Sequence, residues 1–438
     1  MGPRAKHAVV GRARRSALGA TFTLTLVAFA LVAGCGGEER AGGNAPAVEP
    51  PEAPPPDPST EAPEAAPPEP EGDPLPDVAP ALALGGVHSC LADGEGLLRC
   101  WGGNQFGQLG DPGLERHWGA QRAVPAPVLG LSGARRVAAG TFHSCALLGT
   151  GRVVCWGHGG FGQLGDGAVE DRPAPVEVRG LSGVVALTAG EGHTCARLST
   201  RRVWCWGRNL HGQLGDGGRS NVRPSAEVVP GLEDVLEIAA GREHTCALLS
   251  SGGVHCWGAS FEGQLGDDSR HAPEGSRATP EPVLDIADAT AIASGGAHSC
   301  ALREGGSISC WGSNGGGQLG AGVARPAVPH PVAVEGLSDA VAVETGAAHT
   351  CALTAEGRVR CWGSNRFGQL GDGTRDNRRV PVEVRGLEEV VDLSVGARHG
   401  CARTRTGEVR CWGSNWRAQL GDGTTERRPE PVAVAGLR

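Results

Sequence analysis

The chain has 438 residues and a formal net charge of −8, with 72 glycines, 31 prolines and 15 cysteines and no tyrosine. Residues 1–35 hold five basic side chains and no acidic ones, and residues 36–80 hold eleven acidic side chains and one arginine, so residues 81–438 keep a net charge of −3. This near-neutral main part has no concentrated basic tract, which gives little support to nucleic-acid binding.

The first 34 residues have the features of a bacterial lipoprotein signal peptide. Basic residues at positions 4–15 precede an apolar run over residues 17–33, which is too short to cross a membrane comfortably. The run ends in Leu-Val-Ala-Gly followed by Cys35, and this resembles the lipobox, in which the cysteine is lipidated and the peptide is cut before it. We expect Cys35 to carry the lipid. The alternatives are an ordinary signal peptide and an uncleaved anchor.

Residues 35–80 are expected to form a disordered tether behind the lipidated cysteine. The segment is dominated by Pro, Ala and Glu and has no aromatic residue, so it cannot bury enough surface to offset its ordering entropy. Fully extended it reaches about 140 Å at ~3.1 Å per residue. The protein is therefore expected to be exported and anchored by its lipid, at the bacterial outer membrane, on the periplasmic side or at the cell surface.

From residue 81 a unit of about fifty residues recurs seven times, the range of propeller and array repeats. The repeats lie near residues 81–131, 132–181, 182–232, 233–286, 287–337, 338–387 and 388–438. Each holds two cysteines ten positions apart, on short apolar runs that flank a turn, which predicts a β-hairpin with the cysteines opposite each other. The pairs are Cys90 and Cys100, Cys145 and Cys155, Cys195 and Cys205, Cys246 and Cys256, Cys300 and Cys310, Cys351 and Cys361, and Cys401 and Cys411.

Two further strands complete the unit. An apolar run that ends in glycine precedes the hairpin, and a Pro-x-Pro-Val-x-Val run follows it. In the hairpin of residues 145–156 both faces are apolar, so the sheet must be covered on both sides. Four short antiparallel strands repeated seven times predict an all-β fold, a seven-bladed β-propeller in which each blade packs against two neighbours.

The repeated motif also carries a family resemblance. The pattern Gly-x-x-His-Ser-x-Ala-Leu, then Gly-x-Val-x-x-Trp-Gly-x-Asn-x-x-Gly-Gln-Leu-Gly-Asp-Gly, resembles the regulator-of-chromosome-condensation repeat, also called the alpha-tubulin-suppressor-like repeat, over residues 80–438. The resemblance implies a seven-bladed propeller that binds other proteins; relatives include nuclear exchange factors for a small GTPase and secreted bacterial inhibitors of beta-lactamase. This chain departs from the pattern by its cysteine pair in every blade and by Ala418, where the other blades have glycine before Gln-Leu-Gly.

The paired cysteines are expected to form one disulfide per blade. Opposed strand positions are close enough to bridge, and an export signal places the domain in an oxidising compartment. The alternatives are reduced core cysteines and a metal site made of His-x-Cys plus Cys, which would require seven equivalent zinc ions. We expect no metal and no cofactor.

Two other repeated features are expected to be structural. A histidine stands two residues before the first cysteine of each pair, and a sevenfold residue is expected to do a sevenfold structural job, through a side-chain hydrogen bond to backbone in a tight strand entry. The Gly-Gln-Leu-Gly-Asp-Gly segments are expected to be turns, with leucine as the plug between blades and aspartate closing on local backbone amides. The histidines are His88, His143, His193, His244, His298, His349 and His399.

Positions that differ between blades are the candidates for recognition. The site before or near Gly-Gln is occupied by Phe106, Phe161, His211, Phe261, Gly316, Phe367 and Trp416. The longer connections at residues 111–126 and 267–280 add Arg116, His117 and Trp118, and Arg270 and His271. Insertions in propellers cluster on one face, often the binding face, and aromatic residues and arginine are enriched at interfaces. The phenylalanines have an equal alternative interpretation, in which they pack under their own turns.

These observations favour a protein-binding module over an enzyme. Catalytic propellers use carboxylates, histidine or tyrosine near the channel, whereas this chain has no tyrosine and no unrepeated cluster of His, Asp or Glu. Candidate partner-binding residues are Phe106, Arg116, Trp118, Phe161, Phe261, Arg270, Phe367 and Trp416. The rival functions are an envelope hydrolase or lyase with its site at the channel, and a surface adhesion or structural protein.

Overall fold

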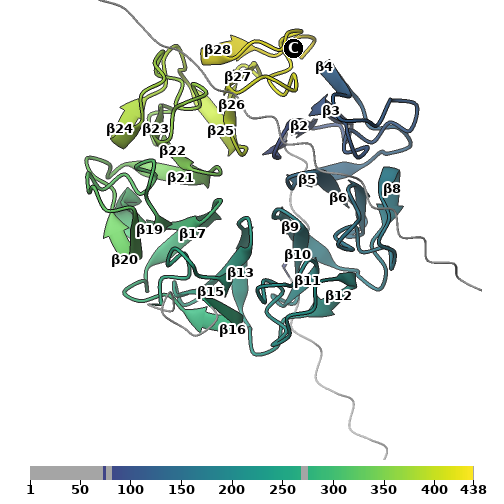
Figure 1. Ribbon diagram of the computed structural model, residues 1–438, viewed down its shortest axis with the longest axis horizontal. Helices are drawn as coiled ribbons and strands as arrows, with labels where there is room; N and C mark the ends of the chain where they lie inside the picture. The colour runs from purple at the N-terminus through teal and green to yellow at the C-terminus, as the bar shows by residue number, and fades with distance from the viewer. Residues whose placement is uncertain (1–72, 75–80, 268–274, 438) are drawn as a thin grey trace, which may run out of the picture. The chain divides into compact units, whose positions relative to one another are not determined.

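The computed structural model of the protein describes residues 73–74, 81–267 and 275–437. From residue 81 the chain forms a ring of seven four-stranded antiparallel sheets, the predicted all-β seven-bladed propeller (Figure 1). The predicted signal peptide, Cys35, all of the tether except Asp73 and Pro74, and the candidates Arg270 and His271 lie outside the described residues.

Each blade is one uninterrupted stretch of chain whose four strands pair in sequence order. Blade 1 contains β1 (Ala81–Leu84), β2 (His88–Ala92), β3 (Leu98–Gly103) and β4 (Gln121–Pro127). Blade 2 contains β5 (Ala134–Ala139), β6 (His143–Leu148), β7 (Val153–Gly157) and β8 (Arg172–Glu177). Blade 3 contains β9 (Val184–Ala189), β10 (His193–Leu198), β11 (Val203–Gly207) and β12 (Arg223–Val228). Blade 4 contains β13 (Val235–Ala240), β14 (His244–Leu249), β15 (Val254–Ala259) and β16 (Ser276–Pro282).

The last three blades repeat this order. Blade 5 contains β17 (Ala289–Ser294), β18 (His298–Arg303), the short 3₁₀ turn η2 (Glu304–Gly306), β19 (Ile308–Ser313) and β20 (Ala327–Ala333). Blade 6 contains β21 (Ala340–Thr345), β22 (His349–Thr354), β23 (Val359–Gly363) and β24 (Arg378–Glu383). Blade 7 contains β25 (Val390–Val395), β26 (His399–Thr404), β27 (Val409–Gly413) and β28 (Arg428–Ala433).

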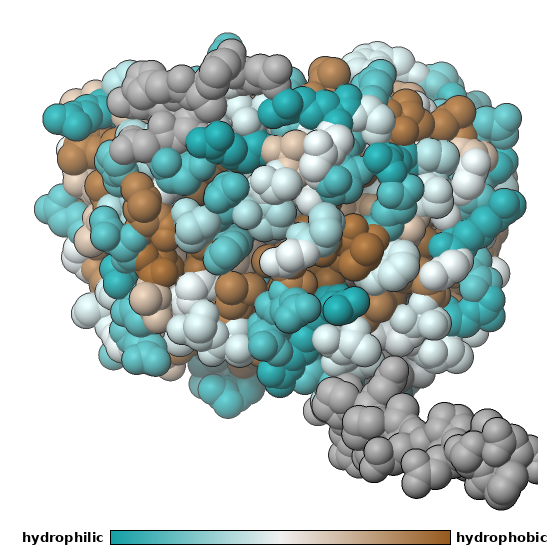
Figure 2. Space-filling view, turned by 90° about the horizontal axis from the view of Figure 1, so that it is seen from below, coloured by the Kyte–Doolittle hydropathy of each residue, from teal (hydrophilic) through white to brown (hydrophobic). Residues whose placement is uncertain are grey.

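Burial increases from the outer strand of a blade to its middle strands. In blade 2 the second strand β6 is buried over its first five residues, whereas the fourth strand β8 has no fully buried residue. The outer wall of the ring accordingly shows hydrophilic and hydrophobic side chains interspersed (Figure 2). Both faces of the middle strands are covered by neighbouring blades, as the apolar hairpins require. No helix among the described residues is long and apolar enough to span a membrane.

The predicted disulfides are confirmed in all seven blades. Cys145 lies directly opposite Cys155 in the β6–β7 register, and the bridged Cα atoms of the seven pairs are 4.0–4.1 Å apart. Each bridge therefore closes one blade on itself and joins no two blades. The seven bridges join Cys90 to Cys100, Cys145 to Cys155, Cys195 to Cys205, Cys246 to Cys256, Cys300 to Cys310, Cys351 to Cys361, and Cys401 to Cys411.

The blades are joined by their buried tryptophans and leucines. Trp206 of blade 3 packs against Leu147, Val153 and Leu164 of blade 2, and all four side chains are almost fully buried. Leu164 belongs to the Gly-Gln-Leu-Gly-Asp-Gly segment, so the predicted role of this leucine as a plug between blades is confirmed. The same arrangement recurs around the ring and supplies its core.

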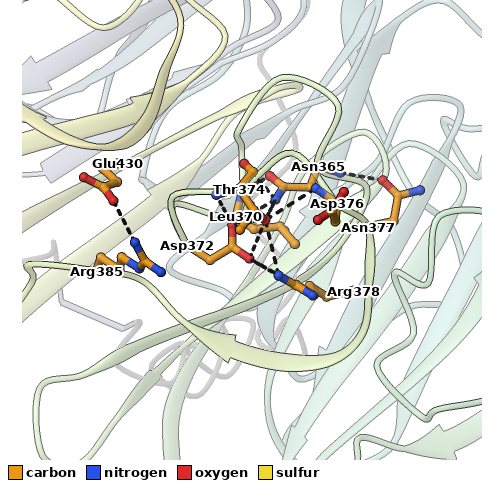
Figure 3. A network of polar contacts seen from close by, with 9 residues as sticks. All are labelled: Asn365, Leu370, Asp372, Thr374, Asp376, Asn377, Arg378, Arg385 and Glu430. Atoms are coloured by element: carbon orange, nitrogen blue, oxygen red, sulfur yellow. Dashed lines mark hydrogen bonds and ion pairs between the residues drawn. The ribbon is translucent and has the colours of Figure 1, made fainter.

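The aspartate of that segment organises its turn, as predicted. In blade 6, Asp372 accepts hydrogen bonds from the Thr374 amide at 2.9 Å and from the Asn365 side chain at 3.0 Å (Figure 3). It also accepts a bond from Arg378 Nε at 3.0 Å, which fastens the turn to the start of β24. Blade 5 has Ala321 at this position and lacks this set of contacts.

The repeated histidines are structural, as predicted. Their hydrogen-bond partner is a side-chain hydroxyl of the neighbouring blade, so the predicted hydrogen bond to backbone was wrong. His88 Nε2 lies 2.8 Å from Ser144 Oγ of the next blade, and that hydroxyl donates to Gln108 O at 3.0 Å. Because the hydroxyl hydrogen is used by the carbonyl, the imidazole Nε2 must be the donor in the first bond. Trp156 Nε1 donates to the same carbonyl at 2.9 Å. We call this ring of contacts the histidine belt.

The belt has one gap. Six histidines reach a serine or threonine hydroxyl of the following blade at 2.8–3.0 Å. His349 faces Gly400, and its Nε2 has no hydrogen-bond partner among the described residues. A Cβ added to Gly400 would lie 2.6 Å from the Trp412 ring, so a serine does not fit there without movement of that ring.

Candidate functional site: the loop face of the ring

The strand order divides the ring into two faces. Successive strands of a blade are antiparallel, so the connections from strand 1 to 2 and from strand 3 to 4 emerge at one end, which we call the loop face. The strand 2–3 turns and the blade-to-blade connections emerge at the other end, which we call the turn face. A central channel of about 730 Å³ is lined by the first strands, and Trp118, Phe142, Arg398 and Trp416 lie at its loop-face mouth.

A row of aromatic rings crosses blades 1 and 2 on the loop face. The Phe106 ring centroid is 5.2 Å from that of Phe142 and 4.6 Å from that of His158, which lies 5.5 Å from Phe161. Phe106 and Phe161 are both partly buried in this row. They pack on side chains of neighbouring connections. They are therefore neither free binding anchors nor rings that pack only under their own turns, which were the two interpretations from sequence.

A second cluster joins blade 7 to blade 1 at the channel mouth. Arg417 places its Cζ atom 5.1 Å from the Trp118 ring centroid and 4.4 Å from that of Trp416. Trp118 is 71% exposed and Trp416 42% exposed, whereas Arg417 is buried between them. We call these three residues the Trp118 cluster. Arg116 is exposed on the same connection as Trp118.

The remaining candidates are spread around the same face. Phe261 of blade 4 is 55% exposed and meets His211 of blade 3 edge to face at 5.2 Å. Phe367 of blade 6 lies under two guanidinium groups, with Arg398 Cζ at 4.9 Å and Arg427 Cζ at 5.3 Å from its centroid. The structure thus places every described candidate on connections of the loop face.

Four contributors were missed by sequence reasoning: Phe142, His158, Arg398 and Arg417. Phe142 and Arg398 directly precede a belt histidine, at a position that differs in nearly every blade, and this variability was the available signal. Arg417 occupies the position of Phe367 in the aligned repeat. Their contacts arise between blades, and sequence spacing within one repeat does not show them.

The loop face of blades 3 and 4 is electrostatically balanced. Arg208 lies over Phe161 at 5.2 Å and its Nη1 contacts Glu243 Oε1 at 3.0 Å. Arg242 pairs with Glu191, and this pairing holds the pKa of Arg242 above its usual value. Each guanidinium in this group therefore has a carboxylate partner.

Three carboxylates face the central channel from inner strands. Burial raises the pKa of Glu237 to about 7, and burial together with the charges of Glu237 and Asp392 raises the pKa of Glu344 to about 8. Glu237 accepts a hydrogen bond from the Ile292 amide of the next blade at 3.0 Å, so it links two inner strands. Sequence reasoning missed these residues because each occurs once, without a repeat to mark it.

The belt histidines are fully buried, and burial favours their neutral form. Burial lowers the pKa of His88 to about 4 and that of His143 to about 3. Within the described residues, no three side chains among His, Cys, Asp and Glu are grouped to hold a metal ion. The loop face, in contrast, gathers aromatic and arginine side chains, the residue types that are enriched at protein interfaces.

The fold and this face define a repeat-built propeller, and sequence comparison names its family. An RCC1-like domain matches residues 225–438, and the regulator of chromosome condensation (RCC1) repeat matches residues 95–147 and 150–197, and also 134–163 and 184–213. These matches together cover most of the ring. The chain therefore belongs to the RCC1 repeat family, in agreement with the resemblance seen in its motifs.

Characterised relatives share part of their length with this chain. The ultraviolet-B receptor UVR8 of Arabidopsis thaliana is 31% identical over 250 residues, which are 56% of this chain and 44% of that protein. The RCC1 domain-containing protein RUG3 of the same plant is 32% identical over 305 residues, 66% of each chain. The probable E3 ubiquitin-protein ligase HERC6 of Homo sapiens is 31% identical over 285 residues, 63% of this chain and 22% of its own length.

Solved structures share the fold. Human WBSCR16 superposes with a TM-score of 0.69 at 23% identity, covering 78% of this chain and 94% of that one. Yeast RCC1 (Prp20), solved bound to Kap60, superposes with a TM-score of 0.67 at 20% identity, covering 78% and 84%.

Proposed function

We propose that the protein is an exported, lipid-anchored binding module whose loop face captures a protein partner in the cell envelope. The Trp118 cluster is the observation that carries this proposal. Two exposed tryptophans and a buried arginine stand at the channel mouth, and a few such anchors normally supply most of the energy of an interface. Unlike the repeated tryptophans, Trp118 and Trp416 contribute little to the core.

The relatives support binding as the general task of this propeller. Yeast RCC1 (Prp20) is described as bound to Kap60 and as having binding properties to Gsp1p and histones. Those partners belong to that protein. We transfer only the use of the ring as a protein-binding platform, because an exported protein does not meet cytoplasmic GTPases.

The anchoring part of the proposal rests on residues 1–35. A basic segment, an apolar run and Leu-Val-Ala-Gly-Cys35 are typical of a lipoprotein signal. The Cys35→Ser protein should lose acyl-lipid labelling and membrane association. Unchanged membrane retention of this variant would contradict the lipid anchor, but it would leave the binding function of the ring untouched.

The binding part is tested by removing the exposed anchors. Proteins captured from intact envelopes by the full chain are purified, and their affinity is measured for the Trp118→Ala/Arg116→Ala protein. We expect the affinity to fall by well over tenfold with thermal stability nearly unchanged, because Trp118 is 71% exposed. Leu129→Ala, which removes a 50% exposed side chain from a blade connection on the turn face, is the matched control.

The result separates the candidate faces. Equal binding after Trp118, Trp416 and Phe261 have all been truncated would exclude these loop-face anchors as the site that captures the partner.

A further inference from the structure

The two arginines above Phe367 differ from the arginine that lies over Phe161. Arg398 and Arg427 lie 4.9 and 5.3 Å from the same ring centroid, and neither guanidinium forms an ion pair with a described carboxylate. Both are exposed on the loop face, and the exposed Arg366 adjoins the ring. We call Phe367, Arg398 and Arg427 the arginine platform.

Comparison with blade 4 shows how the platform arises. The residue directly before the belt histidine is Glu243 in blade 4 and Arg398 in blade 7. Glu243 contacts Arg208 at 3.0 Å and neutralises the arginine that lies over Phe161. In the blade that directly follows Phe161 the same position is Gly192, whereas in the blade that follows Phe367 it is Arg398, which adds a second positive charge over that ring.

Nearby carboxylates are already committed to other arginines. Asp372 binds Arg378 at 3.0 Å, Asp422 binds Arg428 at 2.8 Å, and Glu430 binds Arg385 at 3.1 Å. Figure 3 shows the first and last of these pairs, which hold the turn of blade 6 and its contact with blade 7. The charges of Arg398 and Arg427 are therefore left for an external anion.

A contact elsewhere on the ring shows that two arginines can hold one carboxylate. On the turn face of blade 3, the carboxylate of Asp73 is bound by Arg197 and by Arg201, whose Nη2 lies 3.2 Å from Oδ1. The Asp73 amide donates to Ser199 O at 2.9 Å, so this acidic residue is held by one backbone bond and a pair of guanidinium groups. Hydrogen bonding to Arg201 and Arg197 holds the pKa of Asp73 below its usual value.

We infer that the arginine platform binds an acidic segment of a protein partner, with a carboxylate of that segment held between Arg398 and Arg427. Guanidinium groups that stack on an aromatic face keep their N–H edges free to donate, and charge-assisted bonds to carboxylates are the strong ones. Contact with Phe367 restricts both guanidinium groups before the partner arrives, which lowers the entropy lost on binding. This inference rests on the proposed function and specifies one part of the partner's chemistry.

The test uses the full chain and a defined probe. Binding of a fluorescein-labelled peptide of alternating Glu and Ser is followed by anisotropy in about 50 mM salt, where exposed charges are little screened. The Gln/Ser peptide of the same length is the neutral probe. We expect the acidic peptide to bind, the neutral peptide to bind at least tenfold more weakly, and salt to weaken the acidic complex.

Two double variants localise the binding. Arg398→Gln/Arg427→Gln should weaken the acidic peptide at least tenfold without a shift in thermal midpoint, because both side chains are exposed. The control Arg179→Gln/Arg405→Gln removes the same charge from two exposed arginines on connections of the turn face and should change binding less than twofold. Arg398→Glu, which places the glutamate of blade 4 at this position, should abolish the site because the new carboxylate neutralises the charge of Arg427.

Three results would overturn the inference: no binding of the acidic peptide, equal loss in the control variant, or tighter binding of a single-stranded oligothymidylate than of the peptide. The last result would assign the platform to a nucleic acid. None of them affects the Trp118 experiment, which uses the natural partner, so the two proposals fail independently.

Discussion

At the scale of single residues, two histidines of the belt can be compared directly, one with a hydrogen-bond partner and one without. His143 and His349 occupy the same position of the repeat, but only His143 has a hydroxyl partner, Thr194 at 2.9 Å. Replacing His143 by leucine removes one buried hydrogen bond, worth about 0.5–1.5 kcal/mol. Replacing His349 by leucine removes a buried polar atom without a partner, which relieves a penalty of about 1–3 kcal/mol.

We therefore expect His143→Leu to lower the free energy of unfolding by about 2 kcal/mol more than His349→Leu. Both variants exchange the same ring for the same side chain in fully buried sites, so differences in packing largely cancel. Denaturant unfolding at neutral pH under non-reducing conditions measures the difference. Equal costs for the two variants would show that the belt bonds add no net stability.

Ala418 offers a residue change that should stabilise the ring. It replaces the glycine found in the other six blades and has φ of 57°, in the left-handed region that costs an L-residue about 1 kcal/mol. Ala418→Gly should raise the free energy of unfolding by about 0.5–1 kcal/mol, since relief of strain exceeds the added entropy of the unfolded chain. Gly368→Ala, the reverse change at the same position of blade 6, should destabilise, and a thermal midpoint that falls for Ala418→Gly would contradict the argument.

The residue-scale features that could be predicted from sequence are those fixed inside one hairpin. Cysteines ten positions apart around a turn must be opposite each other, so each disulfide followed from its own repeat. The partner of each histidine could not be found in this way, because Ser144 and Thr194 act across a blade boundary. A serine or threonine does follow most belt histidines, but this recurrence alone does not show which blade it serves.

At the scale of the blade, the disulfide fixes the hairpin that the other strands pair with. Cys195 and Cys205 join β10 and β11, the two middle strands of blade 3. Cys195→Ala/Cys205→Ala removes a bridge that closes a short loop, and the free energy of unfolding should fall by about 3 kcal/mol in the chain-entropy account. Because each bridge lies within one blade, the same change in blade 6 at Cys351 and Cys361 should cost a similar amount. Costs that differ severalfold between the two blades would contradict this independence.

Strand order and the number of blades were predictable because every blade repeats the same four segments. The character of the loop face was predictable only in part. Phe106 and Phe161 stood out by type, but their contact with Phe142 and His158 depends on how the connections of adjacent blades meet. The arginine platform likewise joins Phe367 of blade 6 to Arg398 and Arg427 of blade 7, some thirty and sixty residues further along the chain.

At the scale of the whole molecule, the ring closes without exchanging a strand between its ends. Blades 7 and 1 are each complete sheets, and they meet through side chains and a few backbone bonds. Ser89 contacts His399 at 2.9 Å, Trp101 donates to Gln419 O at 3.0 Å, and the Gly423 amide donates to Ala123 O at 3.0 Å. The closing interface therefore uses the same contacts as the internal interfaces, apart from the one between blades 6 and 7, which lacks the belt bond.

Two sets of titratable groups, the fully buried belt histidines and the half-buried channel carboxylates, give the ring opposite responses to pH. The belt histidines have pKa values of about 3 to 4 in the folded ring and near 6.5 in the unfolded chain, so the unfolded chain binds more protons in between. Their stabilising contribution becomes complete only near pH 8, where the histidines of the unfolded chain are neutral as well, and it is lost as the pH falls. The pKa values of Glu237 and Glu344 are about 7 and about 8 in the folded ring, against roughly 4.3 in the unfolded chain. Here the folded ring binds more protons, so stability falls as the pH rises through this range.

Between pH 6.5 and 8 both sets still change stability, because about half of the imidazoles of the unfolded chain are protonated at pH 6.5. The variant Glu344→Gln has the same histidine contribution, so its comparison with the unchanged ring isolates Glu344. We expect the free energy of unfolding of the unchanged ring, relative to that of Glu344→Gln, to decline by on the order of 1–2 kcal/mol from pH 6.5 to 8. The variant should be the more stable of the two at pH 8, because the amide has no charge to desolvate beside Glu237 and Asp392. Glu356→Gln, in an exposed turn of the same blade, should leave the profile unchanged. Denaturant unfolding from pH 5 to 8 measures the three profiles, and a difference between the unchanged ring and Glu344→Gln that stays constant from pH 6.5 to 8 would show that Glu344 does not titrate in this range.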